Sequence, residues 1–316
     1  MSVPAIQVEN LSKFYGSVKA VNGISFDIAP GELVGFLGNN GAGKSTTMRV
    51  LTTFMPASSG YARVAGFDVM YQSDEVRRRL GYLPESVPLY PEMRVEEYLD
   101  YRARLKDVER SGRSKRIDYC LDRCRIREVR RRLLGTLSKG YKQRVGLADT
   151  LLADPPVLIL DEPLSGLDPV QQEETLASIR DLGGKHTVLF SSHHLPDVEK
   201  VCDRVIIINR GTLKFDGKLS AIGTEAPKVR IEARGSEDAV AKVLWKIPGV
   251  IAITPLNPVP ASKDFAAMEV KMEPGLDLCE TAATALFAAG HPVRRLELKA
   301  ESLEDIYMKA TMGAAS

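Results

Sequence analysis

The sequence lacks the features of a secreted or membrane-spanning chain. No apolar run reaches the about 18 residues that crossing a bilayer requires. The N-terminal MSVPAIQVEN has neither a charged n-region nor an apolar h-region, so we expect no signal peptide. The 316 residues contain only four cysteines, which suits reduced thiols. We therefore expect a cytoplasmic protein without a transmembrane segment of its own.

The composition is that of an ordinary globular protein with room for two domains. Hydrophobic residues make up 44% of the chain and the net charge is +2. Cys120 and Cys124 lie one helical turn apart, but no second Cys or His pair accompanies them, which argues against zinc. His186 and His291 likewise have no partners at ligand spacing, and we interpret them as structural.

Positive charge is concentrated between residues 101 and 145, which contain sixteen Lys or Arg and only five Asp or Glu. One interpretation is a surface near anionic lipid headgroups beside a membrane partner. The other is a solvated helical face. Nucleic-acid binding is disfavoured, because the stretch lacks interleaved aromatics and matches no recognition motif.

A phosphate-binding loop is indicated by GNNGAGKS at Gly38–Ser45, which matches G-x-x-x-x-G-K-[ST]. An apolar run, 32–37, predicts a buried strand before it, and 45–51 predicts a helix after it. Such a loop presents backbone N–H groups to phosphates, the lysine reaches the β- and γ-phosphates, and the serine ligates magnesium. The predicted contacts are Gly38, Asn39, Asn40, Gly41, Ala42, Gly43, Lys44, Ser45 and Thr46.

A second informative stretch runs from Leu137 to Asp168. It begins with a small polar turn that opens a helix, where unpaired N–H groups and the positive dipole end bind anions. It continues into an apolar strand, 157–160, followed by Asp161 and Glu162. Acids at the carboxyl end of a buried strand suit a magnesium ion and an attacking water.

Together these motifs resemble the ATP-binding-cassette (ABC) ATPases over about the first 217 residues. Three longer segments are similar to the ATPase subunits of ABC-2 type exporters. They are LGYLPESVPLY, LSKGYKQRVGLA and SSHHLPDVEKVCDRVIIINRG. The matching positions, in chain order, are Tyr15 for the adenine-stacking aromatic, Gly38–Thr46 for the phosphate loop, Leu137–Tyr141 for the signature LSGGQ, Val157–Glu162 for the magnesium strand, Ser165–Asp168 for the loop after it, and His193 for the switch histidine.

The resemblance implies ATP and Mg²⁺ as cofactors and a role for each matching residue. Lys44 holds phosphates, Ser45 and Asp161 hold magnesium, Glu162 orients the attacking water as general base, and His193 contacts the γ-phosphate. Cassettes of this family form dimers, in which the signature of one chain faces the ATP bound by the other. The residues implied there are Ser138 and Gly140, with Asp168 also at the nucleotide.

The resemblance also implies a fold, partners and a location. The fold is an α/β P-loop cassette with a mixed sheet core, an antiparallel β-subdomain and a helical subdomain. Two cassettes, identical or different, close on ATP and drive a separate transmembrane permease. The chain would lie on the inner face of the membrane through that permease, and no nucleic acid is implied.

Two departures from the family pattern concern the nucleotide site. Glu85 stands where many members have a glutamine that senses magnesium, and a carboxylate can ligate a cation but cannot donate an amide hydrogen bond. The signature has Lys139 and Tyr141 in place of glycine and glutamine. The two remaining signature contacts, a hydroxyl and a glycine, suffice for a γ-phosphate, and the lysine adds favourable charge.

Simpler interpretations of three residues stay open. Glu162 can be a salt-bridged acid at a strand end, and Tyr15 a core aromatic. Of the adjacent His193 and His194, only one can point into the site from a strand end. The motif favours the former, and the latter is interpreted as a packed or exposed neighbour.

The residues after 217 predict a second domain, 218–316. Strands at 228–233, 250–254, 267–272 and 293–298 with helices at 236–247 and 276–289 give β-α-β-β-α-β, the ferredoxin-like order. A last helix, 302–311, begins with a capping sequence. No catalytic constellation appears here, and we hypothesise a regulatory or dimer-stabilising role.

Other functions were weighed against export. Soluble translation proteins of this class carry two cassettes, whereas one phosphate loop occurs here. Chromosome-maintenance ATPases carry long heptad segments between the motifs, which this chain lacks. A non-transport regulatory ATPase is the remaining alternative. A neighbouring gene for a protein with several hydrophobic spans would favour the exporter.

Overall fold

The computed structural model describes residues 3–222, 228–256, 264–273, 278–299 and 302–312. The chain divides into two compact units. One comprises Met1–Leu219 together with the residues from Tyr307 onward, and the other comprises Ser220–Ile306. Among the described residues, no helix combines the length and apolar character needed to span a membrane.

The first unit is built on a six-stranded sheet in the order β10-β9-β3-β8-β7-β6. All neighbours pair in parallel except β10, which is antiparallel to β9. The central strands are apolar and buried along their length, as parallel strands covered on both faces are. Their bounds are β3 Leu33–Leu37, β6 Leu80–Leu83, β7 Val157–Leu160, β8 Thr187–Ser192, β9 Arg204–Asn209 and β10 Thr212–Lys218.

A four-stranded antiparallel sheet, β2-β1-β4-β5, lies beside this core in the first unit. One apolar cluster joins the two sheets across α1, with Met48 of that helix, Ile6 and Val34 all buried in it. The bounds are β1 Ile6–Tyr15, β2 Val18–Ile28, β4 Ser59–Val64, β5 Phe67–Asp68 and α1 Lys44–Leu51. The predicted mixed core with an antiparallel subdomain is confirmed.

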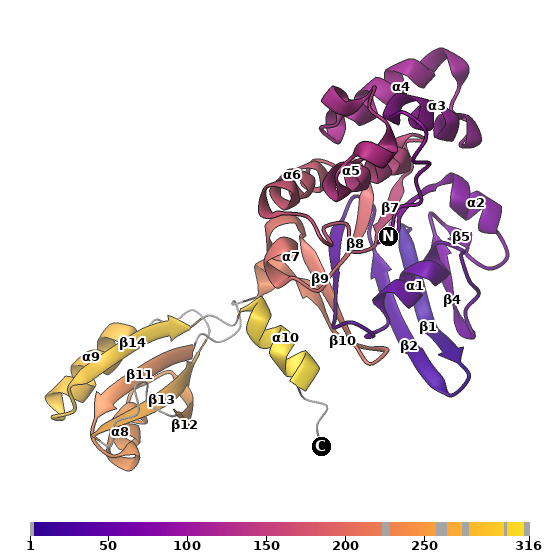
Figure 1. Ribbon diagram of the computed structural model, residues 1–316. Coiled ribbons are helices and arrows are strands. Elements are labelled where there is room, and N and C mark those ends of the chain that lie inside the picture. The colour runs from indigo at the N-terminus through magenta and orange to yellow at the C-terminus, as the bar shows by residue number, and fades with distance from the viewer. Residues whose placement is uncertain (1–2, 223–227, 257–263, 274–277, 300–301, 313–316) are drawn as a thin grey trace. The chain divides into compact units, whose positions relative to one another are not determined.

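The remaining helices of this unit include a helical subdomain. Figure 1 shows α3 and α4 grouped at one end of the unit, next to α5. Ser138 and Asp168 cap the helices that begin after them, each accepting a backbone N–H from the first turn. The bounds are α2 Ser73–Arg78, α3 Val95–Leu105, α4 Arg110–Arg123, α5 Lys139–Leu151, α6 Pro169–Arg180 and α7 Leu195–Val201, with 3₁₀ turns at Arg127–Val129, Leu134–Thr136 and Leu219–Ala221.

The second unit has the predicted ferredoxin-like order. Its antiparallel sheet, β12-β13-β11-β14, packs α8 and α9 against an apolar core that includes Ile231, Leu244 and Leu286. The bounds are β11 Lys228–Arg234, α8 Glu237–Leu244, β12 Val250–Leu256, β13 Phe265–Met272, α9 Cys279–Ala288 and β14 Val293–Lys299. Residues 276 and 277, where the second helix was predicted to start, lie outside the described residues.

The last helix, α10, spans Leu303–Met312, close to the predicted 302–311. Ser302 and Asp305 form reciprocal hydrogen bonds at its start, as the capping sequence predicts. The division between the two units falls inside this helix, since the residues from Tyr307 group with the first unit.

Candidate active site

The loop between β3 and α1 can be made only with glycine at its tightest points. Gly41 and Gly43 have φ of 79° and 109°, which other residues rarely adopt. A Cβ on Gly38 would lie 2.4 Å from the Ile208 carbonyl oxygen, and one on Gly43 would lie 2.5 Å from the Ala20 carbonyl oxygen. The loop is therefore packed between β9 and β2.

Lys44, at the start of α1, is held inside this loop and is only 5% exposed. Its Nζ donates to the Gly38 carbonyl oxygen at 2.7 Å and lies 3.5 Å from that of Asn39. It also forms an ion pair with Glu162 Oε1 at 3.3 Å. The Lys44 amine is thus held by protein oxygen atoms at the wall of a pocket.

The hydroxyl of Ser45 meets the first acid of the magnesium strand. Ser45 Oγ, in the first turn of α1, donates at 3.2 Å to Oδ1 of Asp161, the residue after β7. Ser191, the fifth residue of β8, donates to the same oxygen at 2.8 Å and accepts the Glu162 backbone N–H at 2.8 Å. The sequence analysis did not single out Ser191; the available signal was a small polar residue near the end of a buried strand.

Glu162 and His193, which the motifs predict to act together, lie in direct contact. Glu162 follows β7 and His193 follows β8, and the Nδ1 of the histidine lies 2.8 Å from Oε2 of the glutamate. The Glu162 side chain is 11% exposed and the His193 side chain 50%. Glu162 has φ of 47°, an uncommon conformation for a non-glycine residue that clusters at functional sites.

The phosphate loop, Lys44, Glu162 and His193 line one pocket of about 360 Å³. Glu85, which follows β6 after one proline, lines the pocket with the loop and the catalytic pair. Asp161 is not among the lining residues, but it accepts the hydrogen bond of Ser45, which lines the pocket. The lining residues are Ala20, Asn39, Asn40, Gly41, Gly43, Lys44, Ser45, Thr46, Glu85, Glu162, Ser165 and His193.

Comparisons with known proteins identify relatives along most of the chain. The profile of the family described as ABC transporter matches residues 21–165. The uncharacterised ABC transporter ATP-binding protein YxlF of Bacillus subtilis is 33% identical over 96% of this chain and 98% of its own length. The daunorubicin resistance ATP-binding protein DrrA3 of Streptomyces coeruleorubidus is 30% identical over 98% and 97%. The chain belongs to the ABC transporter family.

Solved structures show the same cassette fold. An ATP-binding subunit of an ABC transporter superposes with a TM-score of 0.63 at 30% identity, covering 69% of this chain and 91% of that one. CbiO1 of Clostridium perfringens, part of an ABC transporter complex, gives 0.65 at 26% identity, covering 78% and 97%. The chain is thus an ATP-binding cassette ATPase.

In this ABC cassette, the signature residues lie apart from the pocket around Lys44. Ser138 and Gly140 at the start of α5, and Asp168 before α6, are not among the residues lining that pocket. Gly140 packs closely on α6, because a Cβ there would lie 2.0 Å from Gln171 Oε1. The signature residues therefore lie outside the pocket that Lys44, Glu162 and His193 line together.

The two unusual signature residues have separate environments. The Lys139 side chain covers Gly166, where a Cβ would meet its Nζ at 2.3 Å. Tyr141 instead packs on the helical subdomain, with its ring centre 4.5 Å from the Arg144 guanidinium and its hydroxyl donating to Glu128 at 2.9 Å. The tyrosine thus takes a structural position where the family commonly has glutamine.

Tyr15 and His194 lie outside the residues that line the ATP pocket. Tyr15 is exposed, its hydroxyl donates to Met55 Sδ at 3.0 Å, and the Lys13 amine lies over its ring, 5.5 Å from the ring centre. Stacking of this ring on adenine stays a prediction. His194 is exposed and precedes α7, 4.0 Å from an Asp197 carboxylate oxygen, which fits the expected neighbour role.

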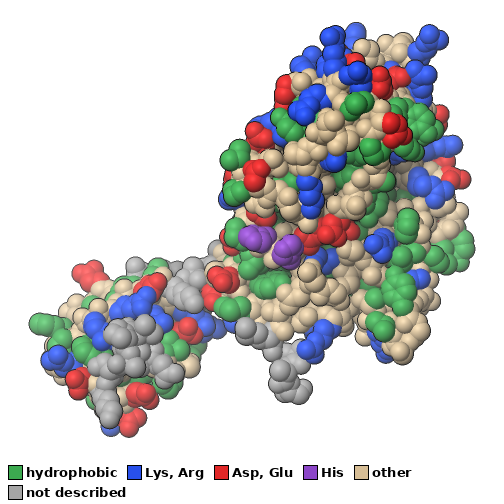
Figure 2. Space-filling model, in the orientation of Figure 1, with side chains coloured by type: hydrophobic (Ala, Val, Ile, Leu, Met, Phe, Trp, Pro, Cys, Tyr) green, Lys and Arg blue, Asp and Glu red, His purple; other side chains and the backbone are tan. Residues whose placement is uncertain are grey.

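The basic stretch of the cassette is largely paired. Figure 2 shows Lys and Arg side chains gathered over the end of the unit that Figure 1 labels α3 and α4. Most of the sixteen cations form ion pairs, which favours the interpretation as a solvated helical surface. The pairs are Arg102 and Lys106 with Asp149, Arg104 and Arg113 with Asp100, Arg116 with Asp154, Arg123 with Asp181, Arg127 with Asp122, Arg130 with Glu96, and Arg144 with Glu174.

Proposed function

We propose that this cassette is the ATPase subunit of an ABC-2 type exporter and drives a separate permease from the inner face of the membrane. The contact chain Lys44–Glu162–His193 carries the ATPase part of this proposal. The export part is supported by full-length relatives named for resistance, DrrA3 and the linearmycin resistance protein LnrL of Bacillus subtilis. Cargo selection belongs to the permease.

The proposed metal is Mg²⁺, bound with ATP. Ser45 and Asp161 already share a hydrogen bond, and Glu85 lines the same pocket. Hydroxyl and carboxylate oxygens are the ligands that this hard cation prefers, so the residues fit it. These residues would hold the ion beside the phosphates, where it neutralises charge that develops during γ-phosphoryl transfer.

The catalytic roles follow from the contacts. Lys44 exchanges its carbonyl and Glu162 partners for the β- and γ-phosphates when ATP binds. This exchange frees Glu162 to orient the attacking water, with His193 keeping the carboxylate in place at 2.8 Å and reaching the γ-phosphate. Ser191 fixes the backbone of Glu162 during this step.

The separation of the signature from its own ATP pocket supports an ATP-dependent dimer. Ser138 and Gly140 present the positive end of α5, and Asp168 lies in the loop after the magnesium strand. In the proposed dimer these residues meet the nucleotide held by the opposite chain, identical or different. Closure and release of the two cassettes is then the step that gates the permease.

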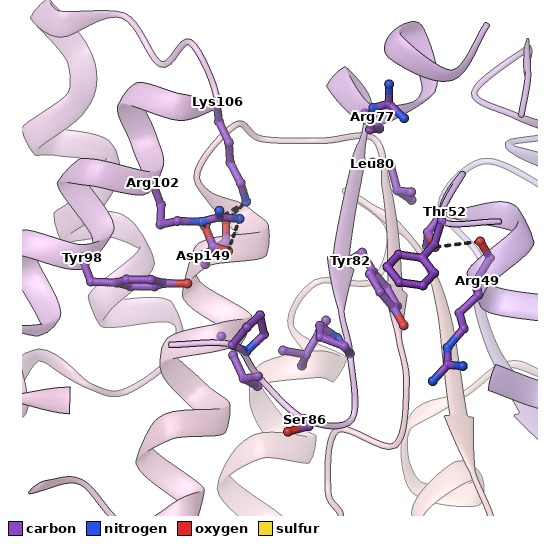
Figure 3. Close-up of a pocket in the computed structure, with 16 residues that line it drawn as sticks. Arg49, Thr52, Arg77, Leu80, Tyr82, Ser86, Tyr98, Arg102, Lys106 and Asp149 are labelled. Carbon is purple, nitrogen blue, oxygen red and sulfur yellow. Dashed lines mark hydrogen bonds and ion pairs between the residues drawn. The ribbon is translucent and has the colours of Figure 1, made fainter. Parts of the chain in front are cut away.

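A groove between the core and the helical subdomain is the proposed permease contact. It has a volume of about 720 Å³ and includes Ser86, Val87 and Pro88, which directly follow Glu85. Figure 3 shows Arg102 and Lys106 converging on Asp149 from one wall, with Tyr82 and Arg49 on the other. The apolar lining between these charged walls suits a short amphipathic segment of the partner.

The domain assignment is part of the proposal. We assign residues 1–217 to the ATPase domain and 218–316 to an accessory region with a regulatory or dimer-stabilising role, of which the residues from Tyr307 onward group with the first compact unit. The compact second unit, Ser220–Ile306, supports an independently folded accessory part. Its own apolar core contains α8 and α9 packed on four strands.

The permease contact can be tested at Phe54, which lines the groove and is 73% exposed. We would co-express the chain with a candidate permease of several hydrophobic spans and measure co-purification and export-linked ATPase activity. Phe54→Asp should abolish co-purification while leaving basal ATPase activity. Tyr71→Asp, at a site 85% exposed outside the groove, is the matched control. Equal co-purification of both variants would contradict the groove as the contact.

A further inference from the structure

The final turns of α10 contact the phosphate loop. The Tyr307 hydroxyl donates to Asn39 Oδ1 at 2.8 Å, although the two residues are 268 positions apart. Both residues belong to the first compact unit. Asn39 lines the proposed ATP pocket, so α10 contacts a residue of the phosphate-binding site through Tyr307.

A second contact anchors the same helix end. Asn209, the last residue of β9, is buried and donates from Nδ2 to the carbonyl oxygens of Ala310 and Thr311 at 3.1 and 3.3 Å. The last carbonyls of a helix lack intrahelical partners, so this amide caps the carboxyl end of α10. Because β9 pairs with β3 in parallel, Asn209 and the phosphate loop both lie at the carboxyl ends of these strands. The two contacts therefore hold α10 at the same end of the sheet.

The loop residue that Tyr307 holds is also in reach of the catalytic lysine. The backbone oxygen of Asn39 lies 3.5 Å from Lys44 Nζ, while its side chain accepts from the tyrosine. Burial and then the charge of Glu162 raise the pKa of Tyr307, so its hydroxyl stays protonated and able to donate. A continuous path of contacts therefore leads from α10 to Lys44.

We propose that Tyr307 is a positioning residue of the ATP site, which orders the phosphate loop through Asn39 before nucleotide binds. A loop with several glycines loses much conformational freedom when its N–H groups converge on phosphates. A hydrogen bond that holds the loop beforehand lowers this cost and tightens ATP binding. The inference rests on the proposed ATP site and adds the C-terminal helix to it.

The test measures ATP affinity of the full chain in a Glu162→Gln background, where turnover is blocked, using a fluorescent ATP analogue. Tyr307→Phe removes only the hydroxyl and should weaken binding about threefold to tenfold, the effect of one hydrogen bond. With Glu162 intact, the same change should raise KM and leave kcat at saturating ATP nearly unchanged. Thr311→Val is the matched control, since its hydroxyl donates to the Tyr307 carbonyl within the helix.

A double-mutant cycle separates positioning from a general structural effect. In an Asn39→Ala background, Tyr307→Phe should have no further effect on affinity, because the contact is already absent. Amide hydrogen exchange in residues 38–43 without nucleotide should be faster in Tyr307→Phe than in the parent, and unchanged in Thr311→Val. This readout needs no nucleotide or permease.

Specific results would overturn the proposal. Unchanged affinity in Tyr307→Phe, an undiminished effect in the Asn39→Ala background, or equal weakening by Thr311→Val would each contradict it. Failure of export or permease binding leaves these measurements intact and contradicts only the proposed transport role. A Glu162→Gln parent that binds no ATP would contradict the ATP site itself and this inference with it.

Discussion

His193 and Glu162 meet across the ends of two adjacent parallel strands, with 2.8 Å between Nδ1 and Oε2. The pairing of β7 with β8 aligns Leu160 with Phe190, so the residues that follow each strand emerge at the same edge. Lys44 approaches the same carboxylate from the neighbouring loop at 3.3 Å. One acid is thus shared between the phosphate-binding lysine and the switch histidine.

The first prediction concerns this acid. Glu162→Gln keeps the size of the side chain but removes its charge and its capacity to accept a proton. ATP binding should persist, whereas hydrolysis should fall by about 100- to 10,000-fold, the contribution of a general base. Steady-state phosphate release beside equilibrium ATP binding would measure both quantities. Near-normal hydrolysis would contradict the role of Glu162.

A second prediction concerns the dimer. Glu162→Gln should form a dimer when ATP is added, measurable by size-exclusion chromatography with light scattering. Adding Ser138→Arg places a bulky cation at the start of α5 and should abolish that dimer. The ATP affinity of each separate chain should change little, because Ser138 does not line its own pocket. A double variant that still dimerises with ATP would argue against the signature contact.

A third prediction concerns Ser191, which links Asp161 to the backbone of Glu162. Ser191→Ala leaves the Glu162 N–H without this acceptor and should lower kcat by roughly tenfold, since an unpaired buried group costs about 1–3 kcal/mol. The Mg²⁺ concentration needed for half-maximal activity should rise. Ser178→Ala is the control, because that buried hydroxyl donates to the backbone carbonyl of Glu174 in its own helix. Equal activities of the two variants would contradict the prediction.

A fourth prediction concerns stability below neutral pH. His186 is buried with Nδ1 2.7 Å from the Pro155 carbonyl oxygen, and burial lowers its pKa below the ordinary 6.5. The folded state thus binds this proton more weakly than the unfolded state does. The contribution of His186 to the free energy of unfolding is complete above about pH 6.5 and is lost as the pH falls below that value.

Urea denaturation of the wild type and of His186→Gln at pH 7.5 and 5.5 tests this. The wild type should lose more free energy of unfolding between the two pH values than the variant. His194→Gln, at an exposed position, is the control and should behave as the wild type. The same loss in wild type and His186→Gln would show that other groups determine the acid sensitivity.

The sequence predicted the cassette and the residue types of its site because both depend on short-range patterns. The glycines of the phosphate loop, the acids after Leu160 and the capping Ser138 are local requirements of backbone geometry and phosphate chemistry. Apolar runs likewise predicted the buried strands of the core. The adenine role of Tyr15 stays a prediction, because no contact in the structure addresses it.

Residues that act through distant partners escaped the sequence analysis. Ser191 is one hydroxyl among several near a strand end, and its role follows from the position of β8 beside β7. Tyr307 lies in the closing helix, where its spacing gave no hint of a partner in the phosphate loop. Such contacts depend on strand order and helix docking, which no local pattern specifies.

By itself, then, the sequence determined which chemical groups this ATPase possesses and on which kind of element each lies. The tertiary structure alone decided which groups meet. It joined Lys44 to Glu162 and His193, placed Ser138 away from the pocket of its own chain, and brought Tyr307 to Asn39. The physical reason is that strand order and packing set the distances between residues far apart in the chain, whereas motif chemistry is encoded within a few neighbouring residues.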